Sequence, residues 1–411
     1  MIRRALQNTG WLMGARGINA VLSLVYLALA TRALGVEGFG QFVVAFTFAQ
    51  LVVGFTSFQT WQAIIRWGQE SEGRKDATGF ALALDAITIV VGTAVAASVL
   101  AFAGDWLPIP SELRVPTFLF TLASLLAIRS TPTGLLRLHD RYARAAAADA
   151  TTSIMRAIGA AIVAILAPSI TAFLVVWSIA ELATAAMYWS MAARTEPVHW
   201  RRFSLLRVPR LQESSWSFVI GTSLTGMLTI ASRQLLVLLV GALGGAALAG
   251  IYRVAAQLGE GLLKLAQALL RALYPELVRN PKQAKRLTSA ITRIAVATGL
   301  AAVALAALAG DWLILVIAGE EFLPAYWPMI ILAGAAAFEL AGASLEALLV
   351  AHGRAIANFI LRAVPTLASI AALPWLVEWQ GTTGAALAVL VASIISVTGF
   401  VIATRRTSTK D

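Results

Sequence analysis

The chain has 411 residues, of which 59% are hydrophobic and only 13% charged. A soluble globular domain carries about 25% charged and 45–50% apolar residues, so this composition excludes an ordinary soluble protein. There is no cysteine, which excludes disulfides, thiolate nucleophiles and cysteine metal sites, and the three histidines are too scattered for a metal cage. We interpret the sequence as that of an integral membrane protein, whose formal charge of +11 reports topology and not nucleic-acid binding.

Stretches of about 20 mostly apolar residues, long enough to cross a bilayer as a helix, recur along the whole chain. They fall near 10–33, 41–65, 78–103, 115–136, 146–167, 170–193, 214–240, 248–271, 289–309, 325–350, 356–377 and 384–404. The first exceeds a signal-peptide core and no cleavage site follows it, so we expect it to be retained. The sequence therefore predicts an all-α polytopic membrane protein with about twelve transmembrane helices.

Basic residues orient this bundle, because loops rich in lysine and arginine stay cytoplasmic. With the N-terminus inside, most lysines and arginines fall in the inner segments, and the outer turns hold only Arg32 and Arg114. We therefore predict that both termini are cytoplasmic. The outer turns are short and partly acidic, too short for a folded domain outside the membrane.

A short repeat predicts two related halves. Residues 103–107 and 309–313 both read AGDWL, 206 positions apart, and the same offset maps Arg156 onto Arg362. Each copy ends the third helix of a predicted six-helix half, so we expect two lobes related by a pseudo-twofold axis along the membrane normal. The predicted domains are an N-terminal six-helix lobe (1–193), a basic cytoplasmic linker (194–213), a C-terminal six-helix lobe (214–404) and a cytoplasmic tail (405–411). A positively charged stop signal explains the composition of the linker equally well.

Charged residues inside the predicted spans mark the candidate site, because a cation near the centre of a membrane helix costs about 2.5–3.5 kcal/mol and faces a partner or a wet cavity. The cations predicted to bind substrate are Arg16, Arg129, Arg156, Arg233, Arg253, Lys264 and Arg362. The acids, interpreted as ion-coupling sites or as counter-ions of the arginines, are Asp85, Asp149, Glu181, Glu260, Glu339 and Glu346. Guanidinium forks match phosphate oxygens with two parallel hydrogen bonds, so this set suits an amphiphile with an anionic phosphate head.

Helical spacing places several of these charges on common faces. The eighth predicted span carries one polar stripe, within about 40° of a line along the helix: Arg253, Gln257, Glu260, Lys264, Gln267 and Arg271. Asp149 and Arg156 share a face of the fifth span, where a neutralised internal pair is the alternative to a substrate contact. Arg129 lies near Pro132, whose missing amide donor can bend the fourth span.

Short motifs spread over the chain form an ordered series. They are NTGW at 8–11 followed by Arg16, ALGVEGFG at 33–40, GIY at 250–252, YP at 274–275, GEEF at 319–322, HGR at 352–354 and GTTGAALA at 381–388. In these motifs the chain resembles the O-antigen and related repeat-unit flippases of the multidrug/oligosaccharidyl-lipid/polysaccharide exporter superfamily, over essentially its whole length. The resemblance implies two six-helix lobes, alternating access and export of undecaprenyl-pyrophosphate-linked oligosaccharides, in many members driven by ion gradients.

We therefore predict a flippase, and not an enzyme, that moves polyprenyl-pyrophosphate-linked oligosaccharide from the inner to the outer leaflet through a cationic central cavity. Expected partners are that lipid, membrane lipids, H⁺ or Na⁺ and other glycan-assembly proteins, with no cofactor or metal, in a bacterial or archaeal cell (inner) membrane. Two alternatives remain open. A cation-coupled multidrug antiporter predicts an acid-dominated cavity, and a membrane enzyme of glycan assembly predicts a compact His/Asp/Glu cluster at one membrane face.

Overall fold

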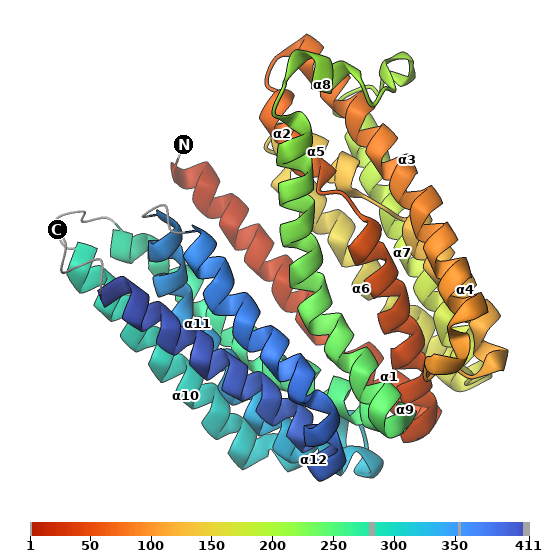
Figure 1. Ribbon diagram of the computed structural model, residues 1–411, viewed down its shortest axis with the longest axis vertical. Helices are drawn as coiled ribbons and strands as arrows, with labels where there is room; N and C mark the ends of the chain where they lie inside the picture. The colour runs from red at the N-terminus through yellow and green to blue at the C-terminus, as the bar shows by residue number, and fades with distance from the viewer. Residues whose placement is uncertain (1, 279–283, 352–354, 406–411) are drawn as a thin grey trace. The chain divides into compact units, whose positions relative to one another are not determined.

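The computed structural model describes residues 2–278, 284–351 and 355–405, and every element within these ranges is helical (Figure 1). The elements are α1 (Ile2–Thr56), α2 (Thr60–Trp67), α3 (Ser71–Phe102), η1 (Gly104–Trp106), α4 (Ser111–Leu126), α5 (Ser130–Leu138), α6 (Tyr142–Leu166), α7 (Ile170–Ala193), η2 (Trp200–Arg202), α8 (Arg207–Leu211), α9 (Ser215–Val278), α10 (Ala284–Ile317), η4 (Glu320–Ala325), α11 (Tyr326–Ala351) and α12 (Ala355–Arg405). In these ranges nine helices are long and apolar enough to cross a membrane. Lipid offers no partner to backbone N–H and C=O groups, which is why apolar segments of this length close their own hydrogen bonds as helices.

The chain divides into two compact units. Unit 1 comprises Met1–Leu34 and Gln41–Leu238, and unit 2 comprises Gly35–Gly40 and Leu239–Asp411. The first part of α9 belongs to unit 1 because the backbone N–H of Gln59 donates to Ser223 Oγ at 3.4 Å and a side chain at Gly226 would meet the Gln59 amide. The division into six-helix lobes on either side of residues 194–213 stays a prediction.

Helix α1 is a folded-back pair and not one straight rod. Tyr26 and Phe46 lie twenty positions apart, about 30 Å along a straight helix. Both rings nevertheless have their centres within 6 Å of the same atom, Arg156 Cζ, at 5.9 and 5.6 Å. The reversal occurs at Gly35, whose φ of 65° and ψ of −178° are accessible essentially to glycine alone. The backbone N–H of Val36 donates to Glu321 Oε2 at 3.0 Å, which fixes this turn within unit 2.

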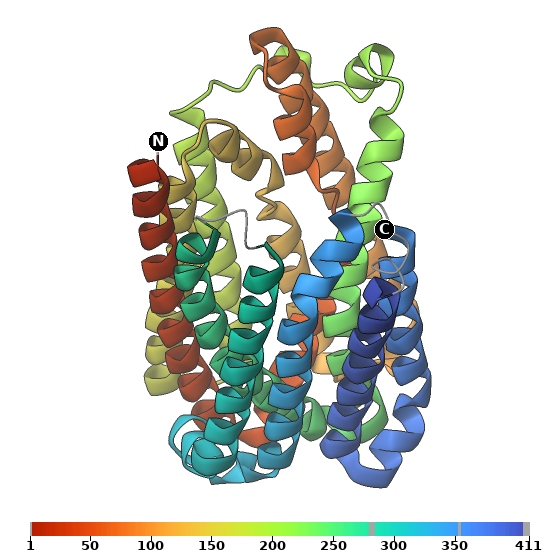
Figure 2. The same ribbon diagram turned by 90° about the vertical axis from the view of Figure 1, so that its left-hand side faces the viewer.

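Helix α12 reverses in the same way within unit 2. Its backbone leaves the helical region at Gln380 and Gly381. Leu361 and Gly399 would be about 57 Å apart in a straight helix, but a methyl group on Gly399 would lie 2.7 Å from Leu361 Cδ2. The two arms therefore pack against each other, and Figures 1 and 2 show them beside α11. Helix α9 has a comparable interruption at Gly245, with φ 87° and ψ 170°.

Two of the predicted spans are each interrupted by a short non-helical segment. The predicted span 41–65 stops at Thr56 and resumes as α2 at Thr60, and the span 115–136 stops at Leu126 and resumes as α5 at Ser130. The second break lies at residues 127–129, before Pro132. Pro132 occupies the first turn of α5, where a missing amide donor is tolerated, so the proline does not itself bend the helix as expected. The AGDWL repeat also differs between its copies, because residues 103–107 follow the end of α3 whereas residues 309–313 lie inside α10.

Candidate functional site

Two arginines of unit 1 converge on one carboxylate. Arg156 Nη2 lies 2.7 Å from Glu181 Oε1, and Arg129 Nη1 lies 2.8 Å from Glu181 Oε2. Arg129 is the residue at the break between α4 and α5, Arg156 lies in the middle of α6, and Glu181 lies in the middle of α7. The Arg156 and Glu181 side chains are each 11% exposed and that of Arg129 is 32% exposed. We call Arg129, Arg156 and Glu181 the arginine triad; its two cations and one anion leave one positive charge in excess.

Aromatic rings surround the buried member of the triad. Arg156 Cζ lies 5.3 Å from the centre of Trp177, in addition to its contacts with Tyr26 and Phe46. Ring faces carry negative electrostatic potential, so they stabilise a guanidinium that has lost its water. Arg156 Nε is nevertheless buried and has no hydrogen-bond partner among the described residues. Arg129, the more exposed arginine, is therefore the member most accessible to a ligand in this conformation.

Asp149 does not pair with Arg156 as the alternative interpretation expected. Its Oδ1 accepts a hydrogen bond of 2.8 Å from the Tyr188 hydroxyl. The hydroxyls of Thr152 and Thr184 lie 2.7 Å apart between the same two helices, α6 and α7. These contacts show that α6 and α7 face each other through a polar seam that ends at the arginine triad.

Asp85 of α3 is a buried predicted acid whose described hydrogen-bond donors are neutral hydroxyls. It is 7% exposed, and its two oxygens accept hydrogen bonds from Thr60 Oγ1 at 3.0 Å and Thr131 Oγ1 at 2.6 Å. Thr60 begins α2 and Thr131 lies in the first turn of α5, so the carboxylate faces the positive ends of both half-helices. Among the described side chains, no ion pair of Asp85 is observed, which distinguishes it from Glu181.

Unit 2 holds a separate charged cluster. Arg362 Nη1 lies 2.9 Å from Glu346 Oε2, and Arg362 Nη2 lies 3.8 Å from Glu339 Oε2. Asn358 Nδ2 donates to Glu346 at 3.2 Å, and Ser393 Oγ donates to Glu339 at 3.2 Å. The Arg362 side chain is 49% exposed, so this cluster is far more open than the arginine triad.

The remaining predicted residues are placed less completely. Arg253 and Glu260 are half-buried on α9 in unit 2. Arg16, Arg233 and Lys264 lie outside the residues whose side chains the structure describes. Thus the described part of the chain brings Arg129, Arg156 and Glu181 together in one unit, and Arg362, Glu339 and Glu346 in the other.

The rings of Tyr26, Phe46 and Trp177 and the hydroxyls of Thr60 and Thr131 are not among the residues predicted from the sequence. Tyr26 and Phe46 come from α1, far from Arg156 in sequence, and no local pattern indicates their contact. Trp177 lies four residues before Glu181 and therefore on the same helical face. That four-residue spacing was the signal in the sequence from which a ring beside Glu181 could have been predicted. Thr60 and Thr131 could have been recognised only once the helix breaks before them were known.

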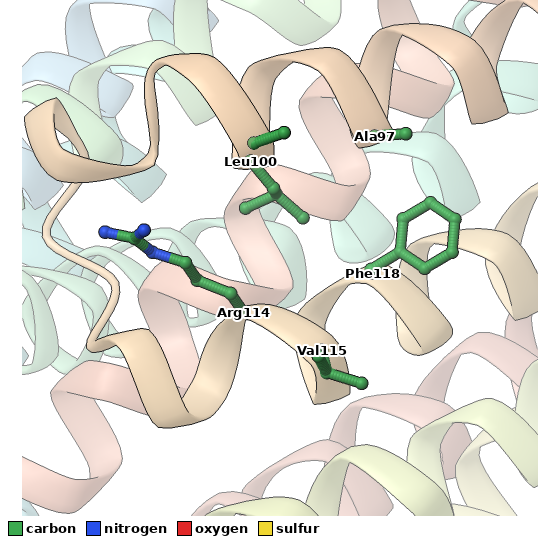
Figure 3. Close-up of a pocket in the computed structure, with 6 residues that line it drawn as sticks. Ala97, Leu100, Arg114, Val115 and Phe118 are labelled. Atoms are coloured by element: carbon green, nitrogen blue, oxygen red, sulfur yellow. The ribbon is translucent and has the colours of Figure 1, made fainter.

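Figure 3 shows an open apolar groove between α3 and α4, with a volume of about 250 Å³. It is lined by Ala97, Leu100, Ala101, Arg114, Val115 and Phe118. Arg114 pairs with Asp105. It lies fifteen positions before Arg129, about 22 Å along a helix. None of the predicted site residues lines this groove.

The fold of this chain is similar to that of solved membrane transporters. The fold matches an inward-facing multidrug resistance MATE family transporter of the MOP superfamily with a TM-score of 0.72, at 17% identity, over 94% of this chain and 95% of that one. It also matches the lipid II flippase MurJ in an inward closed conformation, with a TM-score of 0.74 at 13% identity, over 96% of this chain and 87% of that one. At these identities the likenesses define the fold, which this chain shares with a MATE family transporter and with a lipid II flippase.

Sequence comparison gives the family. Residues 5–280 match the family model described as polysaccharide biosynthesis protein, and the chain belongs to this family. It is also 27% identical over 337 residues to the inner membrane protein YghQ of Escherichia coli (strain K12), covering 79% of this chain and 95% of that one. The chain is therefore a helical, multi-pass membrane protein of the polysaccharide biosynthesis family. The two solved structures named above, whose fold it shares, are a transporter and a flippase.

Proposed function

We propose that this protein is a flippase that moves a polyprenyl-pyrophosphate-linked oligosaccharide from the inner to the outer leaflet by alternating access through a cationic cavity. Its membership of the polysaccharide biosynthesis family supports the substrate class. The observation that carries the proposal is the arginine triad: two guanidiniums held 2.7 and 2.8 Å from a single carboxylate among apolar helices.

The chemistry of the triad suits a diphosphate head. Moving such a head through hydrocarbon without a replacement for its water costs many kcal/mol. A guanidinium replaces that water with paired N–H donors in the geometry of phosphate oxygens. Glu181 holds Arg129 and Arg156 side by side and leaves one positive charge in excess, which favours an anionic ligand. The polyprenyl tail stays in the lipid throughout.

The proposal includes twelve transmembrane helices in two six-helix lobes related by a pseudo-twofold axis. Helices α1, α9 and α12 have 55, 64 and 51 residues, far more than the roughly 20 that cross a bilayer. Each has an interruption near its middle, so each supports two spans. Both termini and residues 194–213 are then cytoplasmic, in accordance with their basic character.

The other predicted residues have assigned parts in this proposal. Arg16, Arg233, Arg253, Lys264 and Arg362 extend the cationic lining along the substrate path. Glu181, Glu339 and Glu346 are counter-ions, because each lies within 4 Å of a guanidinium. Asp85, Asp149 and Glu260 remain the candidates for coupling to H⁺ or Na⁺.

An export assay in the native host tests this function. Arg129→Ala and Arg156→Ala should accumulate lipid-linked oligosaccharide in the inner leaflet and lose most surface glycan, while membrane levels of the protein stay normal. Arg233→Ala is expected to do the same. Arg144→Ala is the matched control, because its exposed guanidinium donates to Thr195 Oγ1 just after α7 and has no ion pair among the described residues. Full export by both triad variants would overturn the proposal.

The same strains separate the two alternatives. A multidrug antiporter would give a drug-sensitive phenotype when the gene is deleted and leave glycan export intact. An enzyme of glycan assembly would alter the composition of the lipid-linked glycan, and not its leaflet. The structure offers such an enzyme only one described His–carboxylate contact, His139 Nε2 to Glu196 Oε2 at 3.2 Å, and Arg74 already pairs with that carboxylate.

A further inference from the structure

The connection between α7 and α9 has one face fixed to α3. Arg202 donates to Asp76 Oδ1 at 3.1 Å and to Glu72 Oε2 at 3.0 Å. Val208 of α8 is buried against Phe80 and neighbouring apolar residues. The backbone also approaches closely, since a side chain at Gly79 would lie 2.0 Å from the Arg202 carbonyl oxygen. This half of the connection is thus a fitted part of unit 1.

The opposite face carries bulky apolar side chains that nothing in the described structure covers. Trp200 is 69% exposed, Phe203 50%, Leu206 56% and Leu211 69%. Single exposed hydrophobic residues are ordinary, but four large ones within twelve residues are a concentration of the kind that marks a membrane or protein contact. We call residues 200–211 the apolar strap.

Charge indicates which of these contacts the strap makes. Residues 199–212 contain four arginines and no acid. Arg202 and Arg207 pair with acids of α3, whereas Arg201 and Arg210 are exposed and form no ion pair among the described residues. Basic residues beside exposed Trp, Phe and Leu are the composition of segments that lie in the headgroup region of an anionic leaflet.

The position of the strap agrees with this partner. It is attached at the first turns of α3, through Glu72 and Asp76. Further along the same helix, Val90 is 68% exposed and Val91 44%, as expected of a membrane span with a lipid-facing side. The strap therefore lies at one end of a lipid-facing helix, where the hydrocarbon meets the headgroups. In Figure 1 it is the segment around α8.

We propose that the apolar strap is a membrane-surface anchor that binds the phosphate headgroups of anionic phospholipids. Trp200, Phe203, Leu206 and Leu211 enter the interface, while Arg201 and Arg210 contact lipid phosphates. Arg202 and Arg207 hold the strap to α3. Anionic lipid in that leaflet then fixes the connection that precedes α9. This inference does not depend on what the protein transports.

The absence of native cysteine makes a site-specific probe possible. Leu211→Cys, labelled with an environment-sensitive fluorophore, is compared with Glu70→Cys, an exposed residue of the loop just before α3. Both are placed in nanodiscs of phosphatidylcholine alone or with phosphatidylglycerol, with nitroxide-labelled lipid as quencher. The Leu211 probe should shift to the blue and be quenched by the lipid, more strongly with phosphatidylglycerol, whereas the Glu70 probe should stay in water.

Removing the free arginines tests the electrostatic part. Arg201→Gln and Arg210→Gln, introduced into the Leu211→Cys protein, should each lower the preference for phosphatidylglycerol about fivefold, as expected for one basic residue near an anionic surface. Neither residue anchors the strap, so folding should be unaffected. Equal behaviour in both lipid mixtures would overturn the proposal. So would a Leu211 probe shielded from lipid and from aqueous quenchers alike, because it would place a protein partner on this face.

Discussion

Thr131 Oγ1 lies 2.6 Å from Asp85 Oδ2, so a buried carboxylate of α3 is bonded to the first turn of α5. The same carboxylate accepts a bond from Thr60 at the start of α2. The backbone N–H of Trp61 donates to Ser130 Oγ at 3.1 Å, which joins the two half-helices directly. Asp85 thus fixes both helix breaks of unit 1 at one point.

Asp85→Asn should weaken this junction without removing it. An amide keeps one accepting oxygen, but its NH₂ group requires one threonine hydroxyl to turn and accept. The positive ends of α2 and α5 also lose their anion. We expect a loss of about 1–2 kcal/mol of stability, measured by thermal unfolding in detergent. Thr131→Val, which removes one of the two donors, should cost about 1 kcal/mol, and an Asp85→Asn protein as stable as the parent would contradict this assignment.

Glu181→Ala should destabilise the protein strongly. It removes the counter-ion shared by Arg129 and Arg156 and leaves a guanidinium that is 11% exposed without an anion. Breaking a buried pair from one side costs about 3–5 kcal/mol. The matched control is Glu339→Ala, whose carboxylate is 45% exposed and 3.8 Å from Arg362, so its loss should cost about 1 kcal/mol or less. Equal unfolding temperatures for the two variants would argue against a buried triad.

The charges of this site could be found from the sequence, but their partners could not. Arg129, Arg156 and Glu181 were all predicted, because a charge in a long apolar segment is visible without any structure. The expected pairing of Asp149 with Arg156 is not observed. Seven residues of helix separate their Cα atoms by about 10 Å along the axis, so a residue of the neighbouring helix α7 is closer. Which carboxylate pairs with a given arginine depends on which helices are in contact and on how far along the helix axis each residue lies.

For the fold, too, some features could be predicted from the sequence and others could not. Composition and hydrophobic run length predicted an all-helical membrane protein. Pro132 indicated only a bend in the fourth span, whereas the helix is broken before it, at residues 127–129. The break at residues 57–59 has no proline or glycine and was missed. The turn at Gly35 was expected as a loop, yet helical backbone continues on both sides of it. One residue with positive φ is enough to reverse the chain, so the apparent loop length in the sequence was misleading.

Gly40→Ala should disrupt the packing within unit 2. The added methyl carbon would lie 1.9 Å from the Ala246 carbonyl oxygen. Both atoms are attached to helix backbones, so relieving the clash requires the helices to move apart. We expect reduced folded yield and a loss of about 1–3 kcal/mol or more, as for other overpacked sites. Gly221→Ala is the control, because its added carbon has no described atom outside its own helix backbone within 4 Å, and alanine favours the helix by about 0.5–1 kcal/mol. A Gly40→Ala protein at least as stable as Gly221→Ala would show that this close approach does not exist.

Arg156→Lys separates charge from geometry in the triad. Lysine keeps the positive charge and can reach one oxygen of Glu181, so the protein should fold with a smaller loss of stability than Glu181→Ala suffers. It lacks the planar fork and fits less well among the rings of Trp177, Phe46 and Tyr26, which contact the guanidinium in the wild type. Glycan export should therefore fall between the wild type and Arg156→Ala when surface glycan is quantified at equal protein levels. Because Arg129 touches Glu181 alone among the described ion pairs and is more exposed, Arg129→Lys should retain more export than Arg156→Lys. The reverse order would mean that the guanidinium fork of Arg129, at the break between α4 and α5, matters more for export than the fork of Arg156.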